Sequence, residues 1–171
     1  MKRNMGTAFG TAVKMVATSP DLKAITSLDH SRAAENLKKL EDLGCKILHG
    51  VDAKNMSHHP FLLYKFFDRI IFNMWGDRDM SQIHVWLPEE CIFMLTKNGE
   101  THVTHKIANS YSKWEIEPLA WYAGLYLIEK ERSFTLEHRG FNNKRGYGIA
   151  VDCSFPIGAC PTFFYTKFGR P

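Results

Sequence analysis

An asparagine at the end of an apolar segment is the first residue of this sequence at which we expect chemistry. Residues 66–73 (Phe-Phe-Asp-Arg-Ile-Ile-Phe-Asn) lose their polar alternation after Arg69 and end at Asn73. A segment that is apolar on both faces is typical of a parallel strand buried between helices. Ligands of an open α/β sheet bind at the carboxyl ends of such strands. Asn73 is therefore a candidate site residue, although an asparagine that caps a strand in a turn fits the same pattern.

Histidines and basic residues provide further candidates. His102 and His105 are three residues apart, so on a strand they would point to opposite faces and make a poor metal-binding pair. Lys144 and Arg145 are flanked by aromatic residues, a composition that suits single-stranded RNA as well as an ordinary basic turn. The four cysteines show no C-x-x-C spacing. We expect reduced thiols and no metal site.

The composition predicts a single globular domain that spans residues 1–171, with 44% hydrophobic and 23% charged residues. The net charge of +4 permits contact with RNA or an anionic surface but does not require it. No apolar run approaches the length of a membrane span, and no apolar signal segment follows Met1, so we expect no membrane partner and a cytosolic or nuclear location. The P-loop, G-x-S-x-G and G-x-G-x-x-G patterns are absent, which argues against nucleotide hydrolysis, serine hydrolysis and a standard NAD fold.

The elements that would position Asn73 begin with a predicted βαβ unit. Residues 13–18 and 46–52 read as strands, and each is followed or ended by an acid, Asp21 and Asp52. Between them, residues 31–43 carry leucine and alanine at helical spacing, and Gly44 is a good residue to end that helix. A strand, a helix and a strand in this order predict a parallel pair with a right-handed crossover.

The second half of the chain alternates in the same way. We expect a helix within residues 83–96 that starts near Leu87 because of Pro88, and a turn at Asn98-Gly99. A strand over residues 100–106 follows, and the capping box at residues 112–115 predicts a helix that ends near Gly124. Residues 125–134 and 161–168 read as a closing pair of strands.

Six stretches, taken in order, resemble one family. The family is the Rossmann-like domain of eukaryotic, notably plant, proteins similar to the 25S ribosomal RNA (uridine-N3) methyltransferases. The similarity runs from about Gly6 to Phe168. The stretches that carry it are Val16–Ser19, Leu48–Asp52, Phe67–Asn73, Leu95–Lys106, Ser112–Glu117 and Asn143–Gly146.

The resemblance implies a class I methyltransferase fold, with helices on both faces of the sheet, that binds S-adenosylmethionine at the carboxyl ends of its strands. It places Asp21 at the cofactor ribose, Asp52 at the adenine edge and Asn73 at the methyl-transfer site. Asn73 would hold the uracil edge, and His105 would accept the proton of N3, unless His105 is a packed strand-end histidine. Ribosomal RNA is the implied partner, with contacts at Lys106, Lys144 and Arg145. The nucleus or nucleolus, or the cytoplasm, is the implied location.

Departures from the family pattern qualify this function. The family opens with a strand and a Gly-rich turn that wraps the cofactor, and both are missing here, because Met1 falls inside the helix that should follow. We therefore expect a truncated member, weak binding of S-adenosylmethionine, and a rearranged sheet or a partner chain that completes it. The alternatives are a non-catalytic RNA- or protein-binding remnant of the fold and a product that does not fold alone.

Overall fold

The computed structural model describes residues 12–20, 33–74, 90–107, 116–131, 153–154 and 158–167. The chain forms two compact units, residues 1–52 with 135–156 and residues 53–134 with 157–171, and each contains its own sheet. The helices within the described ranges are all too short to cross a membrane.

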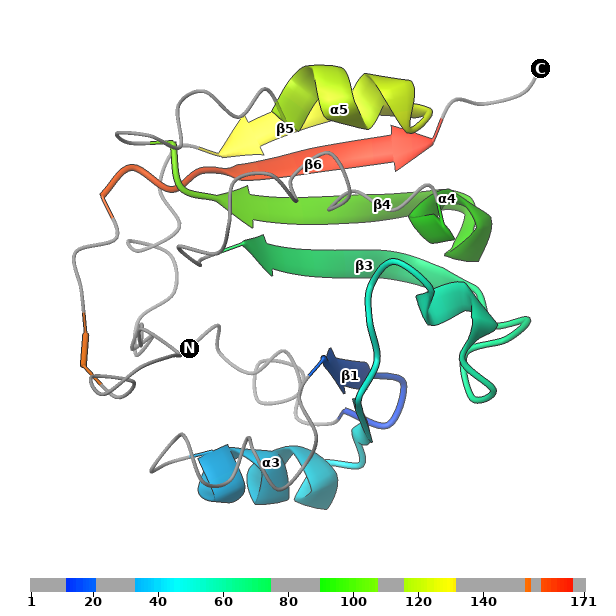
Figure 1. Ribbon diagram of the computed structural model, residues 1–171, viewed down its shortest axis with the longest axis vertical. Helices are drawn as coiled ribbons and strands as arrows, with labels where there is room; N and C mark the ends of the chain where they lie inside the picture. The colour runs from blue at the N-terminus through cyan, green and yellow to red at the C-terminus, as the bar shows by residue number, and fades with distance from the viewer. Residues whose placement is uncertain are drawn as a thin grey trace. The chain divides into compact units, whose positions relative to one another are not determined.

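The first unit contains the predicted βαβ arrangement. Strand β1 (Val16–Ser19) pairs in parallel with β2 (Lys46–His49), and helix α3 (Ala33–Asp42) lies between them in the chain (Figure 1). The register aligns Val16 with Lys46, so the two strands end together at the carboxyl edge. This confirms the parallel pair that the sequence predicted.

Helix α3 ends at the glycine that the sequence predicted. The N–H of Gly44 donates to the carbonyl of Glu41 (2.8 Å), and the N–H of Cys45 donates to that of Leu40 (2.9 Å). This pair of bonds is a Schellman motif, which satisfies the last carbonyls of the helix. Gly44 has φ +87°, and a Cβ there would lie 2.8 Å from Val13 Cγ2. The turn into β2 therefore requires glycine.

The second unit contains a four-stranded mixed sheet with the order β3-β4-β6-β5 (Figure 1). Strands β3 and β4 are parallel, whereas β6 is antiparallel to both β4 and β5. The closing pair of strands that the sequence predicted is confirmed as β5 and β6, and together the parallel pairs and the helices between the strands confirm the α/β, Rossmann-like fold class. The elements are η1 (Met56–His58), β3 (Phe67–Met74), α4 (Glu90–Met94), β4 (Leu95–His105), α5 (Ile116–Tyr122), β5 (Leu125–Glu131) and β6 (Thr162–Lys167).

One face of this sheet carries the core of the second unit. Alternate residues of neighbouring strands, among them Val103, Phe163 and Tyr165, pack with Ile116 and Ala120 of α5. The period of two along each strand puts these side chains on one face and their neighbours on the other. Pro118 is tolerated in α5 because it lies in the first turn, where the backbone N–H groups have no helical partner.

At the start of β4, one element prediction is confirmed and one was wrong. The helix predicted within residues 83–96 is present as α4, which ends at Met94, two residues before the predicted end; Leu87 and Pro88 lie outside the described residues. The turn expected at Asn98-Gly99 lies inside β4, which runs from Leu95 and contains a bulge. Contacts distant in sequence hold the bulge: Thr166 Oγ1 donates to the carbonyl of Gly99 (3.0 Å), and Lys167 Nζ donates to that of Leu95 (2.9 Å).

We expect Gly99→Ala to lower the free energy of unfolding by about 1–3 kcal/mol, the usual cost of overpacking. A Cβ at this position would lie 2.9 Å from the carbonyl oxygen of Phe67 and 3.0 Å from Leu95 Cδ2. Urea unfolding followed by circular dichroism measures the change. Asn98→Ala is the control, because Asn98 is exposed and surface substitutions usually change stability by less than about 0.5 kcal/mol. Equal decreases in the free energy of unfolding for the two variants would contradict the close packing of Gly99 against Phe67 and Leu95.

Candidate active site

Asn73 lies near the carboxyl end of β3 and is exposed. Its register partner on β4 is Thr104. Because β3 and β4 are parallel, their carboxyl ends lie at the same edge of the sheet, where the two arrowheads are drawn in Figure 1. The structure therefore places Asn73 at the edge that binds ligands in open α/β sheets, which agrees with the position predicted for it.

A row of polar side chains continues from Asn73 across the sheet. Thr104 is the partner of Thr162 on β6, and Thr162 is the partner of Glu131 on β5. The hydroxyls of the two threonines are 3.0 Å apart and hydrogen-bonded, and both side chains are buried. Direct cross-strand partners share a face, so Asn73, Thr104 and Thr162 line one face next to the carboxyl edge. The sequence analysis missed both threonines, since residues 58 positions apart carry no local signal of pairing.

His105 lies on the other face of β4. It follows Thr104 directly, so its side chain projects to the face opposite Asn73, and it is 0% exposed. Its N–H donates to the carbonyl of Pro161 (3.1 Å), which ties the end of β4 to the start of β6. The structure does not bring the imidazole of His105 and the amide of Asn73 onto one face.

His102 shares the face of Thr104, two residues earlier on β4. Its Nε2 lies 2.8 Å from Glu100 Oε2, and its ring meets Phe164 edge-on at 4.4 Å between centroids. His102 and His105 therefore point to opposite faces, as the spacing predicted. Among the described residues, no group of three or more His, Cys, Asp or Glu residues could hold a metal ion.

The remaining predicted site residues fall in three different settings. Asp52 is exposed just after β2, next to Val51, whose N–H donates to the carbonyl of Ser19 (2.9 Å).

Lys106 follows β4 and is half-buried. Burial raises the pKa of the Cys160 thiol to about 12, and the positive charge of Lys106 opposes part of that rise. Asp21, Lys144 and Arg145 lie outside the described residues.

The two parallel pairs and the closing antiparallel pair form an α/β, Rossmann-like arrangement. The fold is similar to the crystal structure of PH1948, a candidate RNA methyltransferase from Pyrococcus horikoshii, with a TM-score of 0.53 and 13% identity. That similarity covers 89% of this chain and 62% of the other. The chain belongs to the family described as rRNA (uridine-N3-)-methyltransferase BTM5-like, whose family model matches residues 3–145.

Two proteins of Arabidopsis thaliana are similar over nearly all of this chain. Heavy metal-associated isoprenylated plant protein 41 is 35% identical over 179 residues, which covers 98% of this chain and 35% of that protein. The uncharacterized protein At4g26485 is 32% identical over 178 residues, covering 95% of this chain and 85% of that protein. The chain thus spans about a third of the first relative and most of the second.

The hydrogen bond between Thr104 and Thr162 can be tested with a double-mutant cycle. We expect Thr104→Val and Thr162→Val each to lower the free energy of unfolding by about 1–2 kcal/mol, because each leaves a buried hydroxyl without its partner. The double variant should cost less than the sum, since no unpaired hydroxyl remains. Urea unfolding of the four proteins provides the values. Strictly additive costs would mean that the two hydroxyls do not interact.

Proposed function

We propose that this chain catalyses the S-adenosylmethionine-dependent methylation of uridine N3 in large-subunit (25S) ribosomal RNA. Membership of the family supports the reaction and the substrate class. One structural observation supports a role for a particular residue in this reaction: the amide of Asn73 is exposed at the carboxyl edge of the parallel pair β3–β4. Polar groups at that edge meet ligands in open α/β sheets.

The chain's own residues would orient the base. N3 of uridine lies on the pairing edge, so the nucleotide must be unpaired or flipped out before it can react. An amide both donates and accepts hydrogen bonds, which suits Asn73 to the alternating acceptors and N–H of the uracil edge. Holding N3 in line with the methyl group then accounts for much of the catalysis.

The proton of N3 needs an acceptor, and His105 remains the proposed one. Its burial on the face opposite Asn73 means that this role requires the carboxyl end of β4 to rearrange. Without that rearrangement, His105 positions the end of β4 from within the core. His105→Gln separates these roles, because it removes the base and retains a polar side chain of similar size.

S-adenosylmethionine, when bound, supplies an electrophilic methyl group on a sulfonium. The exposed carboxylate of Asp52, just after β2, fits hydrogen bonding to a nucleoside. We propose that Asp52 binds the adenine edge and that Asp21 binds the ribose. Residues 1–171 by themselves do not include the Gly-rich turn that would bring backbone N–H groups to the cofactor.

We therefore expect weak binding of S-adenosylmethionine, with a dissociation constant well above the micromolar range. Isothermal titration of the purified chain measures it, and Asp52→Asn should weaken the binding further if the carboxylate accepts a hydrogen bond from the cofactor. Asp42→Asn, an exposed acid at the end of α3, is the matched control. Micromolar affinity of the polypeptide of residues 1–171 would refute the weak binding proposed for it.

The activity is tested by transfer of a labelled methyl group from S-adenosylmethionine to unmodified 25S ribosomal RNA, with N3-methyluridine identified by mass spectrometry of nucleosides. We expect Asn73→Ala to reduce the rate by about tenfold or more through loss of alignment. Asn98→Ala, which alters another exposed asparagine of the same sheet, should leave the rate unchanged. Absence of N3-methyluridine at saturating cofactor would reject catalysis by this chain.

A non-catalytic binding role is the second candidate function. Within the described residues, β3 pairs with β4 and with no other strand, and the sheet of β1 and β2 shares no strand with the sheet of β3 to β6. Edge strands pair readily with other chains. We propose that a partner chain adds a strand to this edge, and that the protein works in the nucleus or nucleolus, or in the cytoplasm. A chain that binds ribosomal RNA or a protein without methyl transfer would fit this second function.

A further inference from the structure

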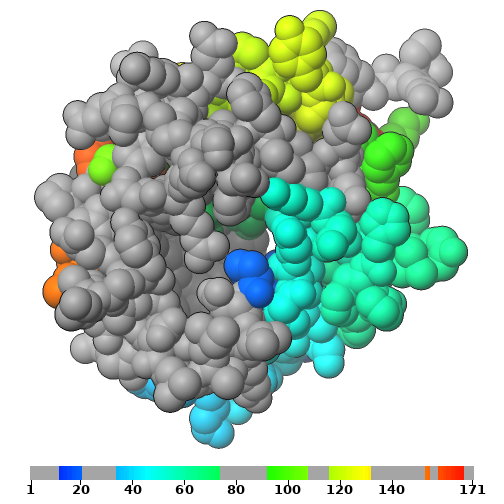
Figure 2. Space-filling view, in the orientation of Figure 1, coloured from blue at the N-terminus to red at the C-terminus, as the bar shows by residue number. Residues whose placement is uncertain are grey.

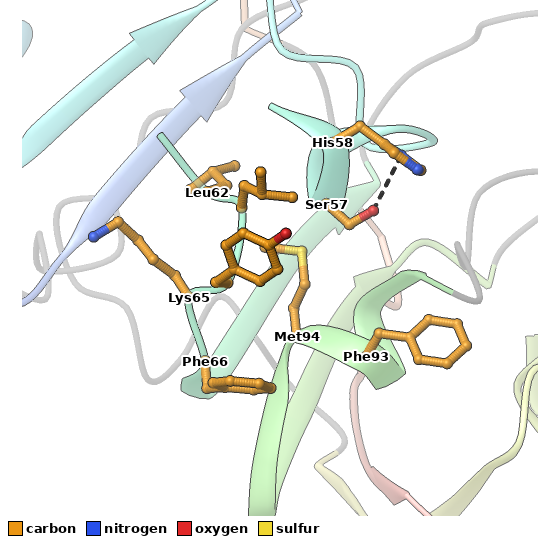
Figure 3. Close-up of a pocket in the computed structure, with 9 residues that line it drawn as sticks. Ser57, His58, Leu62, Lys65, Phe66, Phe93 and Met94 are labelled. Carbon is orange, nitrogen blue, oxygen red and sulfur yellow. Dashed lines mark hydrogen bonds between the residues drawn. The ribbon is translucent and has the colours of Figure 1, made fainter. Parts of the chain in front are cut away.

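A cavity of about 230 Å³ opens at the end of the sheet opposite Asn73. It lies between the segment that precedes β3 and the last turn of α4, which are adjacent on the surface in teal and green in Figure 2. Phe66 immediately precedes β3 and Met94 immediately precedes β4, so the cavity marks the amino edge of the parallel pair. Its lining residues are Ser57, His58, Leu62, Leu63, Tyr64, Lys65, Phe66, Phe93 and Met94 (Figure 3).

Three aromatic rings at this cavity are unusually exposed. Tyr64 is 88% exposed, Phe93 73% and Phe66 66%. We call these three residues the aromatic platform. Large apolar side chains gathered on a surface mark interaction sites, whereas single exposed ones are ordinary.

The backbone at Tyr64 adds to this argument. Its φ is +63°, in the left-handed region that is strained for a residue with a Cβ. The conformation leaves the ring in solvent, so burial within the chain does not compensate the strain. Strain of this kind is found where a side chain is presented to a ligand.

The segment that leads into β3 carries positive charge. Residues 53–67, between Asp52 and Asp68, contain two lysines and two histidines and no Asp or Glu. Lys65 lies between Tyr64 and Phe66 in the sequence, and its Nζ lies 4.6 Å from the centroid of the Phe61 ring. His58 Nδ1 is hydrogen-bonded to Ser57 Oγ at 3.2 Å, the contact dashed in Figure 3. Aromatic rings interleaved with cations suit an anionic ligand that carries flat rings.

We propose that the aromatic platform binds an unpaired stretch of RNA. Bases stack on Tyr64, Phe66 and Phe93, and Lys65 contacts a phosphate. Flat rings that stand in solvent next to a lysine are free to stack on unpaired bases. A protein partner is the other outcome, which the test below distinguishes. The inference rests on the proposed function for its choice of RNA, and it adds a second contact for the substrate. Phe66 lies seven residues before Asn73, about 23 Å along β3, so the platform would hold nucleotides that flank the target.

The test measures binding of a fluorescein-labelled ten-nucleotide oligouridylate to the whole chain by fluorescence anisotropy, without S-adenosylmethionine. We expect Tyr64→Asn to weaken binding by about tenfold, the effect of losing one stacked base. Asparagine tolerates positive φ, so this variant removes the ring without adding strain. Tyr122→Asn is the matched control, because Tyr122 is 84% exposed at the end of α5 and should change nothing. Circular dichroism verifies that both variants are folded.

A second variant tests the charge. Lys65→Gln should flatten the dependence of log affinity on log salt by about 0.7, the contribution of one phosphate contact with a single strand. Equal affinities of the Tyr64 and Tyr122 variants, or no binding by the unaltered chain, would overturn the proposal. Loss of self-association in the Tyr64 variant with unchanged RNA affinity, seen by light scattering, would overturn it in favour of a protein contact. Binding is measured without methyl transfer, so an inactive chain that binds through the platform refutes only the proposed catalysis.

Discussion

The parallel pairing of β3 with β4 is the constraint on which the second unit depends. Parallel strands begin at one edge of the sheet and end at the other, so this single pairing places the residues before the strands and the residues at their ends on two opposite edges. Asn73 and Thr104 come together at the carboxyl edge, and Phe66 and Met94 come together at the amino edge. Both edges depend on the register, because a slip of one residue would turn Asn73 away from Thr104 and move every apolar side chain of β3 to the other face.

The bulge in β4 makes this register possible. From Phe67 to Arg69 the chain of β3 advances by two residues, while β4 advances from Leu95 to Glu100. The extra residues are accommodated at Gly99, where the backbone of β3 leaves no space for a side chain. Bulges re-aim the strand that follows them. Here the residues after the bulge place Val103 in the core and leave Thr104 on the face of Asn73.

The pairing of β6 with β4 determines which side chains lie on each face of the sheet near its carboxyl edge. This antiparallel pairing brings Thr162 to Thr104 and Phe163 to Val103, so polar and apolar partners fall on separate faces. The same alternation puts the side chain of His105 in the core and that of His102 beside Glu100. The chain belongs to the family described as rRNA (uridine-N3-)-methyltransferase BTM5-like. Among the described residues near the carboxyl edge of β3 and β4, the amide of Asn73 is exposed, whereas His105 is buried on the other face.

The sequence by itself determined the local elements and the residues that end them. Helix α3 with its Gly44 end, the strand that stops near Asn73 and the closing strands followed from periodicity and turn chemistry, which depend on the backbone within a few residues. Only the tertiary structure decided the bulge at Gly99, the bond between Thr104 and Thr162, the burial of His105 and the cavity that Phe66 and Phe93 share. These features join segments that lie far apart in the chain, and their geometry is set by strand register, which no local pattern of residues specifies.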